Sequence, residues 1–345
     1  MNRPERVLTT AVRQHTRKIS AGGLTAEGAD GAVVPKGMSA ETILAHPALG
    51  ACVRTQARAL LLTYQTCRRA ASPFASHQRG LMAQAVLARY FRNDANHPGA
   101  GVLAERCIEL VAAYRVASRN TAAAFIREML KYEVLRHVTD SDGQRHRPVE
   151  PSPMTHAVLQ HWLGVHLATL DGLDGGARAA ALRAQPDMLG AIQPVIADGL
   201  LASRAVREPR GTFSLFTWVA DGDIVMDRLF AGCRPEAFGL PRIPTDVMSV
   251  SSLARGLNLS RSQLGRKFAA AEAMQSVGWT ALRGKSALWV SDGFWREYHA
   301  AQAVKLAIID AAFVAASTPR PDFRIPTRPC RRQRHADVKT DSAAG

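Results

Sequence analysis

Two stretches of the chain, 142 positions apart, carry the same succession of local patterns, and this repeat constrains the fold more than any other feature. Sliding the sequence along itself by that distance places Ser118-Arg119 on Ser260-Arg261. Apolar positions then coincide as well, in the pairs Ile108 with Val250, Val111 with Leu253, Ile126 with Phe268 and Leu135 with Val277. Each copy predicts a short helix, a tight turn, a second helix of about four turns and a β-hairpin. The chain should therefore contain two small units built to one plan.

The second copy shows the turn between its two helices most clearly. Ser249 is a suitable N-cap for a helix that buries Val250 and Leu253. The tetrapeptide GLNL that follows predicts the turn, because Asn258 tolerates a left-handed backbone conformation. Ser260 then caps the next helix, and Gln263 three positions later completes a capping-box pattern. These features predict a helix-turn-helix.

The second helix of that copy presents a polar and basic face opposite its apolar one. Leu264, Phe268 and Ala271 follow the i, i+4, i+7 spacing of a buried face. The residues at the start of the helix and around its other side are Ser260, Arg261, Ser262, Gln263, Arg266 and Lys267. Such a face suits the major groove of DNA, where Arg can fork onto guanine, Gln can pair with adenine and flanking cations meet phosphates. We predict that these residues bind double-stranded DNA.

A β-hairpin is predicted directly after this helix. The β-prone runs VGWTAL and ALWVS flank RGKS at 283–286. A hairpin in that place is a wing beside the recognition helix, with Arg283 and Lys285 at its tip. Both cations are predicted DNA contacts.

The first copy repeats the basic face with different residues. Ser118 caps a helix that runs to about Lys131. The predicted DNA contacts at its start and on its outer side are Ser118, Arg119, Asn120, Thr121, Arg127 and Lys131. Glu128 shares that side and would repel phosphate unless it reads a cytosine amine. In the hairpin that follows, Arg145 and Arg147 lie on the returning strand, where arginines suit the minor groove.

Residues 103–170 resemble the winged-helix DNA-binding domain of MarR-type bacterial transcription regulators. The resemblance lies in the run SRNTAAAFIREMLKYEVLRHV, in the wing DGQRHR at 142–147 and in the long helix that starts near Pro153. It implies a dimeric repressor or activator, with Arg145 as the wing residue nearest to DNA. The second copy is closer to a general winged helix-turn-helix than to that family. Tandem winged helices also occur in plasmid replication initiators.

The charge balance favours a polyanionic partner. Lys and Arg number 44 against 29 Asp and Glu, which gives a formal net charge of +15 and a pI near 10.4. Such an excess suits nucleic acid or an anionic membrane surface. No window reaches the roughly 18 uninterrupted apolar residues of a membrane span, so no membrane partner is expected. The five cysteines form no CxxC pattern, and we expect a reducing, cytoplasmic location without disulfides.

The expected fold class is mainly α, with tandem winged helix-turn-helix domains, short β-hairpin wings and connecting helices, because alanine is abundant and strand-like alternation is rare. The expected divisions are a disordered basic arm at 1–38, a first winged-helix domain with N-terminal helices and a dimerisation helix at 39–176, a helical connector and linker at 177–240, a second winged helix-turn-helix domain at 241–316 and a disordered basic tail at 317–345. The proline-rich stretch CRPEAFGLPRIPTD, residues 233–246, is the clearest linker by composition.

Motifs for catalysis, cofactors or metals are missing from the sequence. The patterns GxxxxGK[ST], GxSxG and HExxH do not occur. His156, His161 and His166 are spaced by five, which spreads them around a helix rather than converging them on a metal. We therefore expect no enzyme activity, no catalytic residue, no cofactor and no metal site.

The expected function is that of a sequence-specific DNA-binding transcriptional regulator acting as a homodimer. Leu159, Leu163 and Leu167 recur at i+4, and we expect the helices at 153–171 and 187–206 to form the dimer interface. One alternative is a plasmid-type replication or partition initiator, which needs direct repeats in its target. Another is a helical scaffold that binds an acidic protein. The sequence allows a small-molecule effector but does not identify one.

Overall fold

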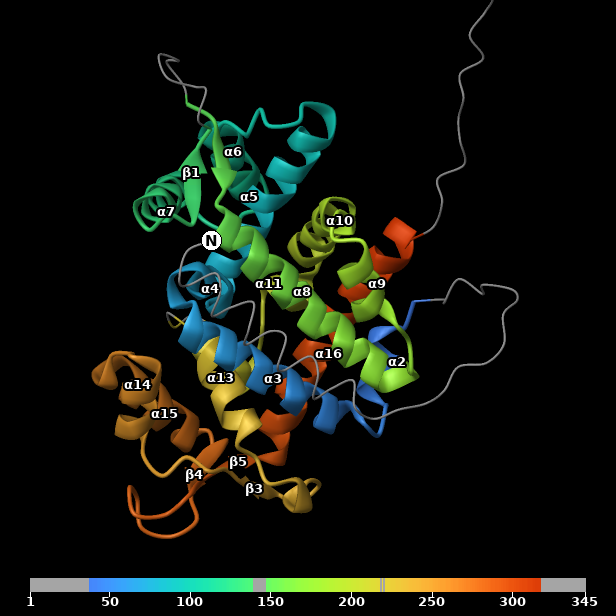
Figure 1. Ribbon diagram of the computed structural model, residues 1–345. Helices are drawn as coiled ribbons and strands as arrows, with labels where there is room; N and C mark the ends of the chain where they lie inside the picture. The colour runs from blue at the N-terminus through green and yellow to red at the C-terminus, as the bar shows by residue number, and fades with distance from the viewer. Residues whose placement is uncertain (1–36, 139–146, 218, 220, 318–345) are drawn as a thin grey trace, which may run out of the picture.

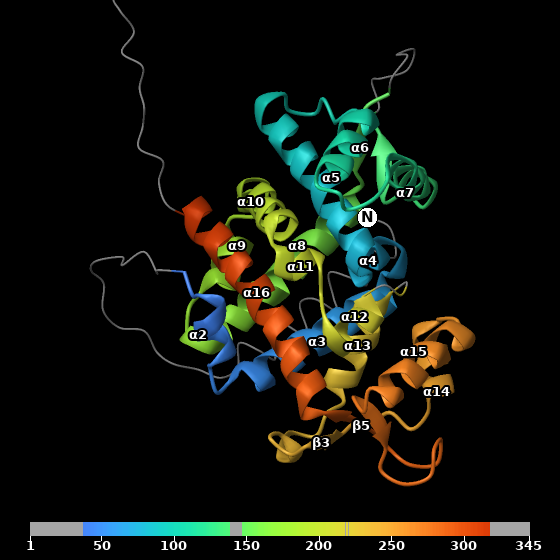
Figure 2. The same ribbon diagram turned by 180° about the vertical axis from the view of Figure 1, so that it is seen from behind.

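The computed structural model describes residues 37–138, 147–217, 219 and 221–317 (Figures 1 and 2). Most of the expected N-terminal arm, the hairpin tip with Arg145 and the tail beyond Ser317 lie outside these residues. The described part is mainly helical with small antiparallel sheets, as predicted.

The elements fall into two segments along the chain. The first segment contains α2 (Ala40–Leu44), α3 (Leu49–Thr66), α4 (Arg68–Ala75), α5 (His77–Asn96), α6 (Ala104–Ala113), α7 (Arg119–Lys131), β1 (Leu135–His137), β2 (Val149–Pro151), α8 (Pro153–Asp174) and α9 (Arg178–Ala184). The second segment contains α10 (Met188–Ala202), α11 (Arg204–Arg207), α12 (Gly211–Thr217), α13 (Gly222–Ala231), the short 3-10 helix η2 (Pro235–Ala237), β3 (Arg242–Pro244), α14 (Val250–Leu257), α15 (Arg261–Ala273), β4 (Val277–Trp279), β5 (Leu288–Ser291) and α16 (Asp292–Ser317).

The strands and helices follow the same order in both segments. In the second, β5 lies between β3 and β4, and Val290 pairs with both Ile243 and Val277 in antiparallel register. In the first, β1 pairs antiparallel with β2, and Val149 of β2 also bridges to Val102. The two predicted strand pairs therefore form, and each gains a third strand position.

That third strand corrects the linker prediction for residues 233–246. Arg242–Pro244 forms β3, an edge strand of the sheet, and Ile243 is fully buried. Prolines are tolerated there because an edge strand needs hydrogen bonds on one side only. The proline content of this stretch predicted a linker and did not reveal the short strand within it.

The two segments pack together because each has a helix that packs on a helix of the other. α3 packs on α13 of the second segment as well as on its own α8, and α10 packs on α5 of the first segment as well as on its own α16. The two long helices α8 and α16 also contact each other. One continuous hydrophobic core results.

Burial within this core overturns the predicted dimer face. Leu159, Leu163 and Leu167 of α8 are each 0% exposed, because helices of the same chain cover them. They are not available to a second copy. The expectation of a homodimer therefore loses the surface on which it rested.

A buried ion-pair network ties α16 to the corner between α8 and α9. The Arg178 guanidinium lies 2.7 Å from Asp310, 2.6 Å from Asp174 and 3.3 Å from Asp171. The Met38 backbone N–H donates to the other oxygen of Asp310 at 2.6 Å. Because Arg178 follows α8 and Asp310 belongs to α16, the network holds the two segments together.

Within the described residues, α16 is the one helix that is long and apolar enough by composition to cross a membrane. It also carries Lys305 and Asp310. Leu306 and Ile309 are fully buried against neighbouring helices, and α16 packs against α8, α10 and α12. In this fold it is a core helix.

Candidate nucleic-acid interface

The predicted turn and caps of the second helix-turn-helix are present in α14 and α15. Asn258 ends α14 with a φ of 53°, the left-handed conformation expected. The Ser260 hydroxyl accepts a hydrogen bond from the Gln263 backbone N–H at 3.4 Å and so caps α15. Phe268 is fully buried, with its ring 5.5 Å from that of Phe216. The opposite side of α15 therefore faces solvent.

The predicted DNA contacts lie at the start and on the outer side of α15. The exposed ones are Ser260, Arg261, Ser262, Gln263 and Arg266. Lys267 is half-buried instead, because Leu264 and Ala271 are its neighbours one turn away and both belong to the buried face. Within the described residues, no carboxylate pairs with Arg261, Arg266 or Lys267. These cations are available to an anionic partner.

The hairpin after α15 is tied to that helix by Glu272. One carboxylate oxygen of Glu272 accepts a hydrogen bond from the Trp279 indole N–H at 2.8 Å. The other lies 3.3 Å from the Arg283 guanidinium. Gly284, with a φ of 74°, allows the turn, and Lys285 is exposed there. Arg283 is thus drawn toward the end of α15, whereas Lys285 remains exposed at the tip.

The first segment builds the same arrangement. The Ser118 hydroxyl accepts a hydrogen bond from the Thr121 backbone N–H at 3.1 Å and caps α7. Ser118 and Ser260, matched by the sequence repeat, therefore both cap helices of 13 residues. The predicted DNA contacts at the start and on the outer side of α7 are exposed, namely Ser118, Arg119, Asn120, Thr121, Arg127 and Lys131.

Arginines pair with two acids beside this face, Glu128 and Glu105. Arg79 of α5 makes two hydrogen bonds to the Glu128 carboxylate, at 3.0 and 2.9 Å, and its guanidinium lies 5.3 Å from the Phe125 ring centre. This pair removes the repulsion of phosphate expected from Glu128. Glu105 pairs with Arg119, and both side chains are largely exposed. Such an exposed pair contributes only about 0–1 kcal/mol, so phosphate can compete for Arg119.

The first hairpin is described only in part. β1 and β2 pair from Leu135 with Pro151 to His137 with Val149. Arg147 is exposed just before β2. Arg145, the predicted wing contact, lies outside the described residues.

α7 and α15 lie on the same side of the molecule, with α4 between the two modules (Figures 1 and 2). Helices α4 and α5 brace both turns: the Arg68 guanidinium donates to the Asn258 carbonyl at 3.0 Å, and the Gln78 amide donates to the Val116 carbonyl at 2.9 Å. α4 also exposes Arg69, a cation that the sequence did not single out. The backbone leaves the helix at Cys67, and α4 starts afresh at Arg68.

Comparison of the chain with models of known protein families, with curated proteins and with solved structures gives no match. Function therefore has to be inferred from the residues of this chain.

Proposed function

We propose that the protein is a sequence-specific DNA-binding transcriptional regulator in which one chain brings two winged helix-turn-helix modules to one duplex. The observation that carries this proposal is the pair of exposed, basic helix faces on α7 and α15, which share one local design and one side of the molecule. A duplex offers successive major-groove openings along one side, so a chain with two such helices can occupy two of them.

The order of elements supports the winged helix-turn-helix assignment. Each module consists of a helix, a strand position, two helices joined by a tight turn, and two further strands, the last of which pairs with both others. The helix after the turn is the one with the basic face. The resemblance of residues 103–170 to MarR-type regulators points to transcription as the process.

The exchanged packing of the two segments suggests an approximate two-fold relation between them. α3 on α13 corresponds to α10 on α5, and α3 on α8 corresponds to α10 on α16. Since two-fold related reading helices match two-fold related half-sites, the expected target is an inverted repeat. A direct repeat, which the replication-initiator alternative requires, does not fit this relation. One chain then provides what a homodimer provides elsewhere.

The test is selection of bound fragments from a random DNA pool by the full chain, followed by sedimentation of the complex. We expect an imperfect inverted repeat bound by one chain per duplex. Arg127→Ala on α7 and Arg266→Ala on α15 should each relax preference in a different half-site. Arg183→Ala, an exposed arginine on α9, is the matched control and should change neither. Selection of direct repeats would favour an initiator. Binding without sequence preference that an acidic protein abolishes would favour a scaffold.

A further inference from the structure

A cavity of about 540 Å³ lies at the junction of the two segments. Residues of α3, α4, α5 and α8 form one side, and residues of α10 to α13 and of α16 form the other. Most of its surface is apolar, with walls that include Phe74, Trp162, Leu200, Phe213 and Ile224. This size and lining are typical of small-molecule sites, which measure roughly 300–1,000 Å³.

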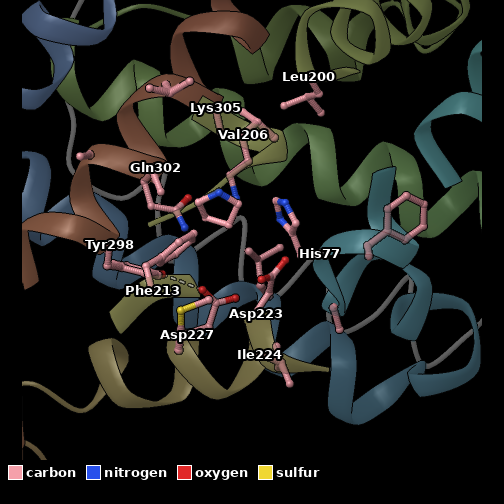
Figure 3. A pocket seen from close by; sticks show the side chains of 18 of the residues that line it. His77, Leu200, Val206, Phe213, Asp223, Ile224, Asp227, Tyr298, Gln302 and Lys305 are labelled. Carbon is pink, nitrogen blue, oxygen red and sulfur yellow. Dashed lines mark hydrogen bonds between the residues drawn. The ribbon is translucent and has the colours of Figure 1, made fainter. Parts of the chain in front are cut away.

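The ionisable side chains that line this space include His77 of α5, Asp223 and Asp227 of α13, and Lys305 of α16 (Figure 3). Asp227 accepts a hydrogen bond from the Tyr298 hydroxyl at 2.6 Å. One carboxylate oxygen of Asp223 and the Nε2 atom of His77 are shielded from solvent and have no hydrogen-bond partner among the described residues. Buried polar atoms are normally paired, so these two are open to a ligand.

The deep part of the cavity has more acid than base. The other two acids that line it are engaged, Glu208 with Arg204 at 2.7 Å and Glu297 with the Phe213 backbone N–H at 2.9 Å. Arg204, Glu208 and Arg210 are exposed, so they belong to the outer rim.

Two carboxyl groups in the interior therefore face one ammonium group, that of Lys305. No carboxylate of the described residues lies within 4.0 Å of Lys305. Burial raises the pKa of Asp223 and of Asp227 to about 7, and it lowers the pKa of His77 and of Lys305. The interior is short of positive charge.

We propose that this cavity binds a small organic amine with an apolar ring system, whose ammonium group lies between Asp223 and Asp227 and whose ring packs against Trp162 and Phe74. The ammonium supplies the positive charge that the two carboxyl groups lack and a hydrogen-bond donor for the unpaired oxygen of Asp223. The apolar body fills space that water would occupy at a cost. Because both segments form the walls, an occupant also biases the relative position of α7 and α15, a consequence that rests on the proposed function.

The first experiment measures binding of three matched probes to the full chain without DNA, by calorimetry at pH 7.5. The probes are 1-naphthylmethylamine, 1-naphthalenemethanol and 1-naphthoate, which share a ring system and differ in charge. We expect the amine to bind at least about tenfold more tightly than either other probe. Equal binding of the three, tighter binding of the carboxylate, or no binding of the amine at 1 mM would overturn the proposal.

Variants locate the site. Asp223→Asn and Asp227→Asn should each weaken amine binding about tenfold while leaving the alcohol unchanged, and Lys305→Met should strengthen amine binding, because it removes a like charge. Asp187→Asn changes an exposed acid outside the cavity and should have no effect. If the Asn variants do not fold, the relative affinities of the three probes for the parent chain still test the proposal. Unchanged amine preference in both folded Asn variants would place the amine elsewhere.

A second experiment separates the cavity from DNA binding. The amine should change the affinity of the parent chain for its selected DNA and should not do so in Asp223→Asn. Amine binding with no effect on DNA affinity would overturn the coupling between the segments and leave the site standing. A chain that binds the amine but no DNA at all would refute the proposed function instead.

Discussion

Replacing Arg178 by methionine tests how strongly the two segments are held together. The Arg178 side chain is 3% exposed and Asp310 is 0% exposed, so the substitution leaves a buried carboxylate whose remaining partner among the described residues is the Met38 N–H. Breaking a buried ion pair by removing one partner costs about 3–5 kcal/mol, because the remaining charge is uncompensated. Asp171 and Asp174 keep more solvent and add little to that cost. We expect a loss near the lower end, about 3 kcal/mol, because Met38 still donates.

Thermal unfolding provides the assay, since a loss of 3 kcal/mol lowers the melting temperature of a chain of this size by roughly 4–5 °C. Arg204→Met is the matched control: Arg204 also pairs with an acid four residues away, at 2.7 Å, but the two side chains are 76% and 54% exposed. Solvent screens that exposed pair, so its loss should change the melting temperature little. A double variant with Asp310→Leu as well should recover part of the loss, because no buried charge is then left. Equal melting temperatures for Arg178→Met and Arg204→Met would refute the reasoning from burial.

Three further predictions follow from the interface and the cavity. Arg266→Ala should weaken binding to a selected site by about 1–3 kcal/mol and relax the preference at one base pair. Lys267→Ala should instead weaken binding to all DNA sequences equally and lower the slope of log affinity against log salt concentration by about one. Binding measured at several salt concentrations distinguishes the two variants. Arg79→Ala should weaken DNA binding by unpairing Glu128, and adding Glu128→Ala should restore it; no recovery in a gel-shift assay would contradict this. Because burial raises the pKa of Asp223 from 3.8 to about 7, the folded chain holds that proton more firmly than the unfolded chain, and this carboxyl destabilises the fold as pH rises from about 4 to 7. The melting temperature of Asp223→Asn, relative to that of the parent chain, should therefore rise between pH 5 and pH 8.

The local features of the helix pairs α6–α7 and α14–α15 could be predicted from the sequence. The caps at Ser118 and Ser260 and the left-handed turn at Asn258 depend on hydrogen bonds between residues no more than four apart. The burial of Phe268 follows from helical spacing alone. Such features are readable because their causes lie within one or two turns of chain.

Pairings between distant residues could not be predicted in the same way. The Glu128 carboxylate meets Arg79, which is 49 positions away, and Arg178 meets Asp310, which is 132 positions away. The apolar stripe that includes Leu163 showed that one face of α8 must be buried, but it did not show which element covers that face. A second copy and the chain's own helices satisfy that stripe equally well, and only the fold distinguishes them.

Under the proposed function, the register of the sequence repeat also indicates which residues would read DNA bases. Positions that cap the helices or begin them are identical, with Ser118 matching Ser260 and Arg119 matching Arg261. Caps and phosphate contacts carry no sequence information, so nothing requires them to differ between the modules.

The positions that point outward within each helix do differ: Asn120 matches Ser262, Thr121 matches Gln263 and Ala124 matches Arg266. These are the side chains that a major-groove helix would turn toward base edges. A homodimer must present the same face to both half-sites, whereas one chain with two modules can read two different ones. The two half-sites of the target should therefore differ most at the base pairs opposite Gln263 and Arg266. Exchanging Thr121 and Ala124 for Gln and Arg should make the selected half-sites more alike.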